Sequence, residues 1–179
     1  MPVLVKLTAL GLHQACLRRG EHMVVIGANR PRLYATMLAV QALGAIPIPL
    51  YQDAVGAECV FPITNADVRF AMVEDQEQVD KLLEIRDRCP DLAHIIFDDP
   101  RGLRNYEEPG LVALDQLMAS GRSLAENRPS FFTSEVDKSS PDDVAAMFFT
   151  SGTTGNPKGG VHTHATRLDR AQACAAFDK

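Results

Sequence analysis

The sequence has few cysteines, no long hydrophobic run and no excess of positive charge. Its four cysteines are scattered without C-x-x-C spacing, which argues against a zinc cluster or a redox pair and fits a reducing cytoplasm. Eighteen lysines and arginines stand against 23 aspartates and glutamates, so the net charge is −5. A nucleic-acid-binding surface needs clustered positive charge, so we expect no nucleic acid as a main partner.

The apolar segments are also too short for a membrane. None approaches the roughly 18 uninterrupted apolar residues of a transmembrane span. The first dozen residues are apolar but include Lys6 and Thr8, which argues against a signal peptide. With 46% hydrophobic and 23% charged residues, the chain has the composition of a soluble globular protein, and we expect it in the cytoplasm.

Short β-branched runs alternate with longer helical patterns in the first hundred residues. This rhythm is typical of βαβ units, so we predict an α/β fold with a mostly parallel sheet flanked by helices. Pro47 and Pro49 place the second strand near an edge of the sheet, because proline lacks the N–H of a central strand. The predicted strands are 23–28, 45–50, 68–73 and 94–97, and the predicted helices are 31–43, 54–66 and 77–88.

Residues 98–140 are charged and interrupted by proline and glycine. We interpret them as a long excursion with one helical run at 112–119. The apolar run at 144–149 then predicts a central strand, and a helix is expected to open near Val161.

The segment 150–160, with the sequence TSGTTGNPKGG, has the composition of a phosphate-binding loop. Glycines let a backbone approach an anion, hydroxyl and N–H groups donate to phosphate oxygens, and a lysine adds a point charge. The segment fits neither the Walker pattern, which needs Gly-Lys-Ser/Thr, nor the dinucleotide fingerprint G-x-G-x-x-G. On composition alone, a surface linker of turn residues is the alternative.

The run from Phe149 to Gly159 resembles the signature loop of the adenylate-forming (AMP-binding) enzymes: acyl-CoA synthetases, adenylation domains and luciferases. The stretches 29–31 and 41–51 are similar to the first βαβ segment of that family. Residues 97–104 and 112–117 resemble the excursion of long-chain fatty acyl-CoA synthetases. The resemblance identifies the whole chain, 1–179, as a partial N-terminal subdomain of such an enzyme.

The resemblance implies an AMP-forming acid–thiol ligase that uses ATP, Mg²⁺ and coenzyme A to convert a long-chain fatty acid through an acyl-adenylate into acyl-CoA. It implies that Thr150, Ser151, Thr153 and Thr154 donate to the ATP phosphates, and that Gly152 and Gly155 admit backbone amides. Lys158 would offset charge on the departing pyrophosphate. No catalytic residue and no metal ligand is assigned in this chain, and Mg²⁺ is expected to be held by groups elsewhere.

The chain departs from the family pattern at Gly160, where a branched apolar residue is usual; in a helix, glycine would cost up to about 1 kcal/mol. The family's later adenine, ribose and lysine segments are not found, so we expect an internal fragment that is inactive alone. The resemblance leaves peripheral membrane association of the full-length enzyme open.

Three alternatives stay open at this point. An amino- or aryl-acid adenylating relative would carry the same loop. A non-catalytic nucleotide-binding module would hold phosphate without acyl transfer. A truncation product without function would expose sheet edges and aggregate.

Overall fold

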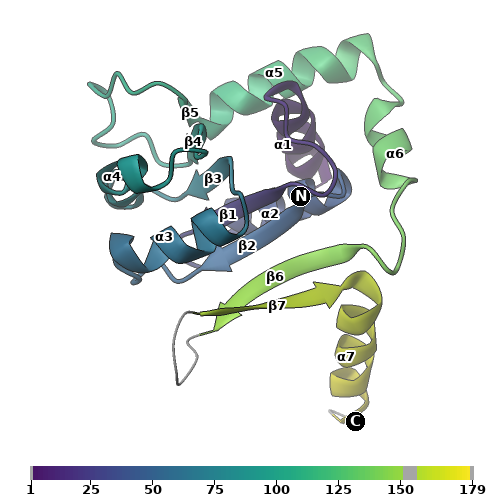
Figure 1. The fold of residues 1–179 in the computed structure, drawn as a ribbon. Coiled ribbons are helices and arrows are strands. Elements are labelled where there is room, and N and C mark those ends of the chain that lie inside the picture. Colours follow the sequence, from purple (N-terminus) through teal and green to yellow (C-terminus); the bar gives the residue numbers. More distant parts are fainter. Residues whose placement is uncertain (1, 151–156, 178–179) are drawn as a thin grey trace.

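A five-stranded sheet forms the body of the molecule (Figure 1). The computed structural model describes residues 2–150 and 157–177. All neighbouring strands in this sheet run parallel, in the order β2-β1-β3-β4-β5, which confirms the predicted α/β class. The strands are β1 (His22–Ile26), β2 (Ile46–Leu50), β3 (Phe70–Val73), β4 (His94–Phe97) and β5 (Leu111–Ala113). The four predicted strands agree with β1 to β4 to within about two residues at each end, which is the usual uncertainty of strand bounds.

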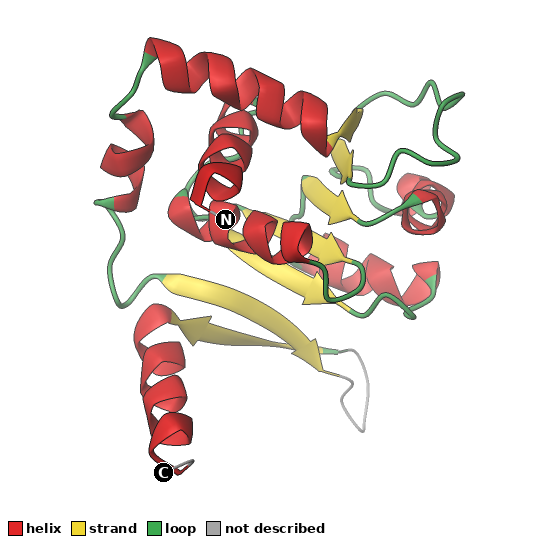
Figure 2. Cartoon of the chain, turned by 180° about the vertical axis from the view of Figure 1, so that it is seen from behind, coloured by secondary structure: helices red, strands yellow, loops and turns green. Residues whose placement is uncertain are grey.

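Helices cover both faces of this sheet (Figure 2). Because side chains alternate along a strand, Val24 and Ile26 enter the core beneath α3 and α4, whereas Met23 and Val25 enter the core beneath α1, α2 and α5. The helices of the body are α1 (Pro2–Gln14), α2 (Pro31–Ala42), α3 (Gly56–Asn65), α4 (Gln76–Glu84) and α5 (Leu114–Asn127), with a 3₁₀ turn η1 (Arg86–Arg88) after α4. The predicted helices at 31–43, 54–66 and 77–88 correspond to α2, α3 and α4 with η1.

The segment 98–140 has more regular structure than the single helical run expected at 112–119. It contains β5, α5 and a short helix α6 (Phe131–Val136). Helix α5 crosses α1 closely, because Gly11 and Gly121 lie at the crossing: a Cβ added at Gly121 would lie 2.1 Å from the carbonyl oxygen of Leu7. The segment thus joins the N-terminal helix to the sheet.

The strand before the loop does not belong to the five-stranded sheet. Strand β6 (Val144–Thr150) pairs antiparallel with β7 (Lys158–Thr163), and α7 (His164–Phe177) follows. The prediction of a central strand at 144–149 is therefore wrong, as is a helix opening near Val161. The helix begins later because Gly159 and Gly160 are poor helix formers. The hydroxyl of Thr163 caps the helix by accepting the N–H of Thr166 at 3.3 Å.

Strand β6 lies beside β2, the edge strand of the body (Figure 1). Its first residues are near the end of α2, where the side-chain amide of Gln41 donates to the carbonyl oxygen of Ala145 at 2.6 Å. Its last residues share a cavity with Leu50 and Tyr51, so β6 runs in the direction of β2. In the part of the chain that the structure describes, no helix is both long and apolar enough to cross a membrane.

Candidate functional site

The hairpin of β6 and β7 brings the two ends of the predicted phosphate loop together. Thr150 and Lys158 are cross-strand partners, and both are exposed. Directly opposite residues in an antiparallel pair have Cα atoms about 4.5 to 5.5 Å apart. The hydroxyl of Thr150 and the ammonium of Lys158 therefore flank one loop mouth. The other predicted site residues, Ser151, Gly152, Thr153, Thr154 and Gly155, lie outside the described residues.

Local sequence explains why this segment forms a hairpin. Five cross-strand pairs besides the bulged start hold the register, including Phe148 opposite Gly160 and Phe149 opposite Gly159. A Cβ added at Gly159 would lie 3.4 Å from the ring of Phe149, so this glycine leaves room for that side chain. The ring of His162 meets that of Phe148 edge-on at 5.4 Å. The pairing of the bulky Phe149 with a glycine thus lets β7 lie flat against β6 next to the loop.

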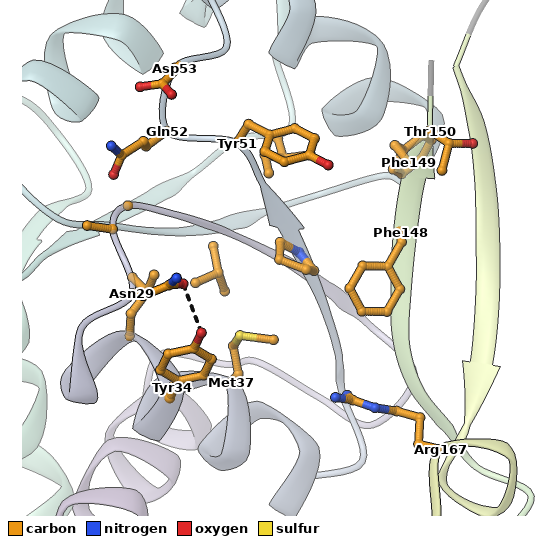
Figure 3. A pocket seen from close by; sticks show the side chains of 16 residues that line it. Asn29, Tyr34, Met37, Tyr51, Gln52, Asp53, Phe148, Phe149, Thr150 and Arg167 are labelled. Atoms are coloured by element: carbon orange, nitrogen blue, oxygen red, sulfur yellow. Dashed lines mark hydrogen bonds between the residues drawn. The ribbon is translucent and has the colours of Figure 1, made fainter. Parts of the chain in front are cut away.

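A cavity of about 780 Å³ lies between the hairpin and the body (Figure 3). Thr150 lines it, together with Phe148 and Phe149 from the same strand. Its opposite wall comes from the start of α2, where Leu33, Tyr34 and Met37 contribute apolar surface. Further lining residues lie at the ends of β1 and β2 or directly after them: Val25, Gly27, Ala28, Asn29, Pro49, Leu50, Tyr51, Gln52 and Asp53. Such a volume, apolar with a few polar groups, is the size of a typical small-molecule site.

Polar groups stand at two ends of the cavity. Asn29 accepts the hydroxyl of Tyr34 at 2.8 Å near the end of β1, and Gln52 and Asp53 follow β2. At the other end, Arg167 extends from α7 toward Phe148 (Figure 3). The cavity can therefore hold an apolar or aromatic group between a cation and a set of hydrogen-bonding side chains.

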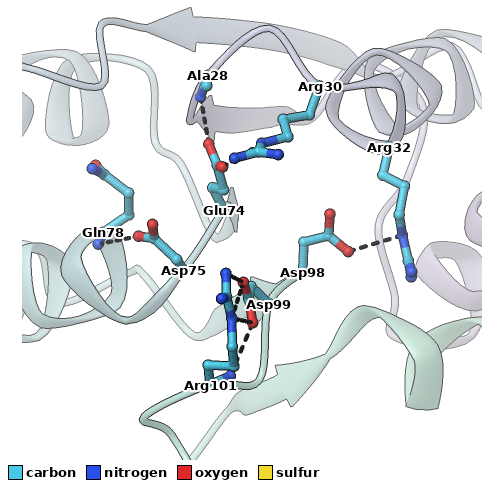
Figure 4. Close-up of polar contacts among 9 residues, drawn as sticks. All are labelled: Ala28, Arg30, Arg32, Glu74, Asp75, Gln78, Asp98, Asp99 and Arg101. Atoms are coloured by element: carbon cyan, nitrogen blue, oxygen red, sulfur yellow. Dashed lines mark hydrogen bonds and ion pairs between the residues drawn. The ribbon is translucent and has the colours of Figure 1, made fainter.

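Part of the carboxyl edge of the parallel sheet, where such folds usually bind ligands, is occupied by ion pairs (Figure 4). The switch point lies between β1 and β3, because the chain leaves these neighbours in opposite directions. There Glu74 accepts the N–H of Ala28 at 2.6 Å and pairs with Arg30 at 2.6 Å. A phosphate at this point would meet a carboxylate, so the anion site favoured by the residues is the hairpin loop.

Neighbouring carboxylates on this edge differ in their pKa. Burial raises the pKa of Asp98 despite an ion pair with Arg32 at 2.8 Å, and the nearby carboxylates of Asp115, Asp99 and Glu74 act in the same direction as burial. Hydrogen bonds from Arg101 lower the pKa of the partly buried Asp99 to about 2. Both groups make local contacts on this edge, and neither lines the cavity beside the hairpin.

Sequence reasoning missed the cavity residues. Tyr51, Phe148 and Arg167 line one cavity only because β6 lies beside β2 and the first turns of α7 lie near β6. The spacing of Thr163 and Thr166, which marks a helix start, was the one local signal that could have placed Arg167 on the first turns of α7.

Comparison with known proteins decides the family. The profile of the AMP-binding enzymes matches residues 4–179, nearly the whole chain. The chain belongs to the AMP-binding enzyme family. Long-chain-fatty-acid–CoA ligase 5 of Rattus norvegicus is 29% identical over 161 residues, covering 86% of this chain and 22% of that protein. A long-chain-fatty-acid–CoA ligase of Mycobacterium bovis is 23% identical over 173 residues, covering 97% of this chain and 27% of that protein.

Solved structures show the same fold. An anthranilate CoA ligase in complex with anthranoyl-AMP superposes with a TM-score of 0.78 at 22% identity, over 95% of this chain and 30% of that one. Acetoacetyl-CoA synthetase from Streptomyces lividans gives a TM-score of 0.72 at 18% identity, over 94% of this chain and 25% of that one. This member of the AMP-binding family spans between a fifth and a third of the length of these relatives, so it matches one part of them.

Proposed function

We propose that this chain supplies the ATP phosphate loop of an AMP-forming acid–thiol ligase. The observation that carries the proposal is the pairing of Thr150 with Lys158 across the mouth of the loop. The hydroxyl donates a hydrogen bond to a phosphate oxygen, and the ammonium offsets the negative charge that grows on the departing pyrophosphate. The loop residues between them, Ser151, Gly152, Thr153, Thr154 and Gly155, complete the donor set.

The reaction we propose has two steps. The carboxylate of the acid attacks the α-phosphorus of ATP, which forms an acyl-adenylate and releases pyrophosphate. The thiol of coenzyme A then attacks the acyl carbon, a thioester forms and AMP leaves. Within the described residues, the loop mouth acts on the first step, because its donors face the charge that leaves with pyrophosphate.

Mg²⁺, which such a reaction uses, would need carboxylate or similar oxygen ligands. Within residues 2–150 and 157–177, no three side chains of histidine, cysteine, aspartate or glutamate come together to hold a metal ion. We therefore assign no step of the reaction to a metal held by this part of the chain.

The acid we propose is a long-chain fatty acid. The support comes from the sequence relatives, which are long-chain-fatty-acid–CoA ligases. The cavity beside Thr150, with its walls of phenylalanine, leucine and methionine, is compatible with a hydrocarbon chain or with the apolar part of another substrate. We further propose that the chain acts in the cytoplasm and is one piece of a larger AMP-binding domain.

Titration of ATP into the purified chain tests the loop. The wild type should bind, and Lys158→Ala should weaken binding about 10- to 100-fold, because one charge-assisted hydrogen bond is worth about 1.5 to 3 kcal/mol. Lys6→Ala, which removes the same charge from α1, is the matched control and should bind as the wild type does. Equal affinity of the Lys158→Ala variant would contradict the role of the loop.

An exchange assay separates a ligase part from a binding module. Radiolabelled pyrophosphate should not enter ATP when the isolated chain is incubated with ATP and palmitate, since the chain matches only part of its relatives. Exchange at a measurable rate would show that the chain is catalytically complete. Exchange with anthranilate in place of palmitate would favour an aryl acid instead.

A further inference from the structure

The hairpin that carries the loop rests on the body without a strand ladder. The N–H of Ile46 donates to the carbonyl oxygen of Glu21 at 2.8 Å, on the β1 side of β2. In a parallel strand, alternate residues bond to alternate neighbours. The backbone nitrogens of Pro47 and Pro49 therefore point toward β6, and neither carries a hydrogen that could be donated. Among the described residues, no backbone hydrogen bond joins β2 to β6.

Side chains replace the missing ladder at the start of β6. The amide of Gln41 donates to the carbonyl oxygen of Ala145 at 2.6 Å. Arg19, from the loop between α1 and β1, pairs with Asp143 at 2.9 Å and donates to the carbonyl oxygen of Glu135 at 3.2 Å. Ala145 is fully buried, so its carbonyl oxygen depends on a protein donor.

At the other end of β6, the contacts that the described residues make with the body are apolar. Phe149 packs on the core beneath α3, where its ring meets that of Phe61 at 6.2 Å in an edge-on arrangement. From Ala145 to Thr150 the strand is about 16 Å long, at roughly 3.3 Å per residue. Apolar packing resists separation but allows sliding, because it is not directional. The polar contacts near Ala145 therefore set the position of β6 along β2.

The residues directly before β6 also position α7. The N–H of His164 donates to the carbonyl oxygen of Asp143 at 3.1 Å, and that of Ala165 donates to the carbonyl oxygen of Pro141 at 2.9 Å. A shift of residues 141–145 would thus move both the loop mouth at Thr150 and the side chain of Arg167 in the cavity.

We propose that Gln41 is a positioning residue for nucleotide binding: through its hydrogen bond to Ala145 it fixes the β6–β7 hairpin, and with it the phosphate loop, against the body. Arg19 is the second anchor, through Asp143. This inference rests on the proposed function for its effect on ATP, whereas the placement of the hairpin can be measured without ATP.

Gln41→Met tests the inference because methionine keeps the length of the side chain, carries no charge and cannot donate. Exchange of backbone amides in β6 and β7 should become about three- to tenfold faster, the factor that corresponds to one neutral hydrogen bond, while β1 and β3 stay unchanged. The affinity for ATP should fall by a similar factor. Thermal unfolding of the body should stay near that of the wild type. Gln116→Met, at an exposed position on α5, is the matched control and should change neither quantity.

The outcomes separate the two proposals. If the wild type does not bind ATP, the proposed function fails, and amide exchange in Gln41→Met alone decides whether Gln41 fixes the hairpin. If the wild type binds ATP and the Gln41→Met variant shows unchanged exchange or unchanged affinity, the inference about Gln41 is overturned while the proposed function stands. A second variant, Arg19→Gln, tests whether the second anchor compensates for the loss of the first: it should accelerate amide exchange in the same two strands.

Discussion

The five-stranded body and the β6–β7–α7 unit are held together in different ways. Every inner strand of the body has a hydrogen-bonded neighbour on each side and two apolar cores, one on each face. The β6–β7–α7 unit has one antiparallel pair, side-chain anchors to the body and an α7 surface that is largely exposed from Thr166 onward. The comparison shows that the loop with the predicted chemistry sits on the less constrained unit, whereas the body supplies a rigid reference for it.

The largest effect is expected from a substitution that leaves a cavity in the core of the body. Phe70→Ala should lower the free energy of unfolding by about 3 to 5 kcal/mol, because Phe70 is fully buried and stacks on His94 at 4.6 Å. Leu168→Ala on α7, where the side chain is 61% exposed, should change it by less than about 0.5 kcal/mol. Chemical denaturation followed by circular dichroism suits a chain without tryptophan. Similar losses for both variants would show that α7 is as well packed as the body.

The next effect tests whether the segment 98–140 is part of the body. Gly121→Ala should destabilise by about 1 to 3 kcal/mol through overpacking, although alanine is the better helix former. The added Cβ would meet the backbone of α1, with the nitrogen of Gly11 at 2.7 Å as well as the oxygen of Leu7. Arg122→Ala, at the neighbouring exposed position, is the control. A neutral or stabilising Gly121→Ala would mean that α5 is free to move away from α1.

A smaller effect, a gain in stability, is expected from a substitution in the hairpin. Gly160→Val should stabilise it by up to about 1 kcal/mol, because valine favours strands and an added Cβ would have only the oxygen of Phe148 nearby, at 3.6 Å. Gly159→Val is the matched comparison: there the Cβ would approach the sulfur of Met147 to 3.2 Å, so the gain should be absent. Amide exchange in β6 and β7 measures both. The result also bears on the family pattern, in which a branched residue at this position is usual.

The smallest effect is a pH dependence within the body. Burial, aided by Arg69, lowers the pKa of His94, so the folded state favours the neutral ring while the unfolded chain takes up a proton near the ordinary value of 6.5. Stability should therefore decline as the pH falls below that value and level off below the folded pKa. His94→Phe should remove this part of the slope in denaturation midpoints measured between about pH 5 and pH 8. His13, whose pKa is also lowered by burial, leaves a residual slope of the same sign.

The body could be predicted well from sequence because its signals are local. The β-branched run at β1, the helical spacing of α2 and the Asp75 cap of α4 each specify one element, and alternation with helices specifies a parallel sheet. Glu74 shows the limit: an acidic residue just before α4 is typical of a helix start, but its side chain bonds to Ala28 and Arg30, forty-odd residues away in sequence. No local pattern encodes such a partner.

The site could be predicted only in part. The loop composition marks Thr150 and Lys158, but the antiparallel hairpin that pairs them was misjudged as a strand followed by a helix. An apolar run such as 144–149 suits a central strand as well as a hairpin strand, since periodicity reports burial and not the partner. The cavity was not predicted at all, because its walls come from four separate stretches of the chain.

By itself the sequence determined which segments extend or coil, the parallel class of the body, and the glycine- and hydroxyl-rich chemistry of the loop; these follow from the conformational limits and donor groups of single residues. Tertiary structure alone decided where that chemistry stands. Pro47 and Pro49 offer β6 no backbone N–H, Gln41 and Arg19 hold the hairpin beside β2 through side-chain contacts, and a cavity forms between the hairpin and the body. The physical reason is that contacts across more than a hundred residues depend on which surfaces meet, and no short stretch of sequence contains that information.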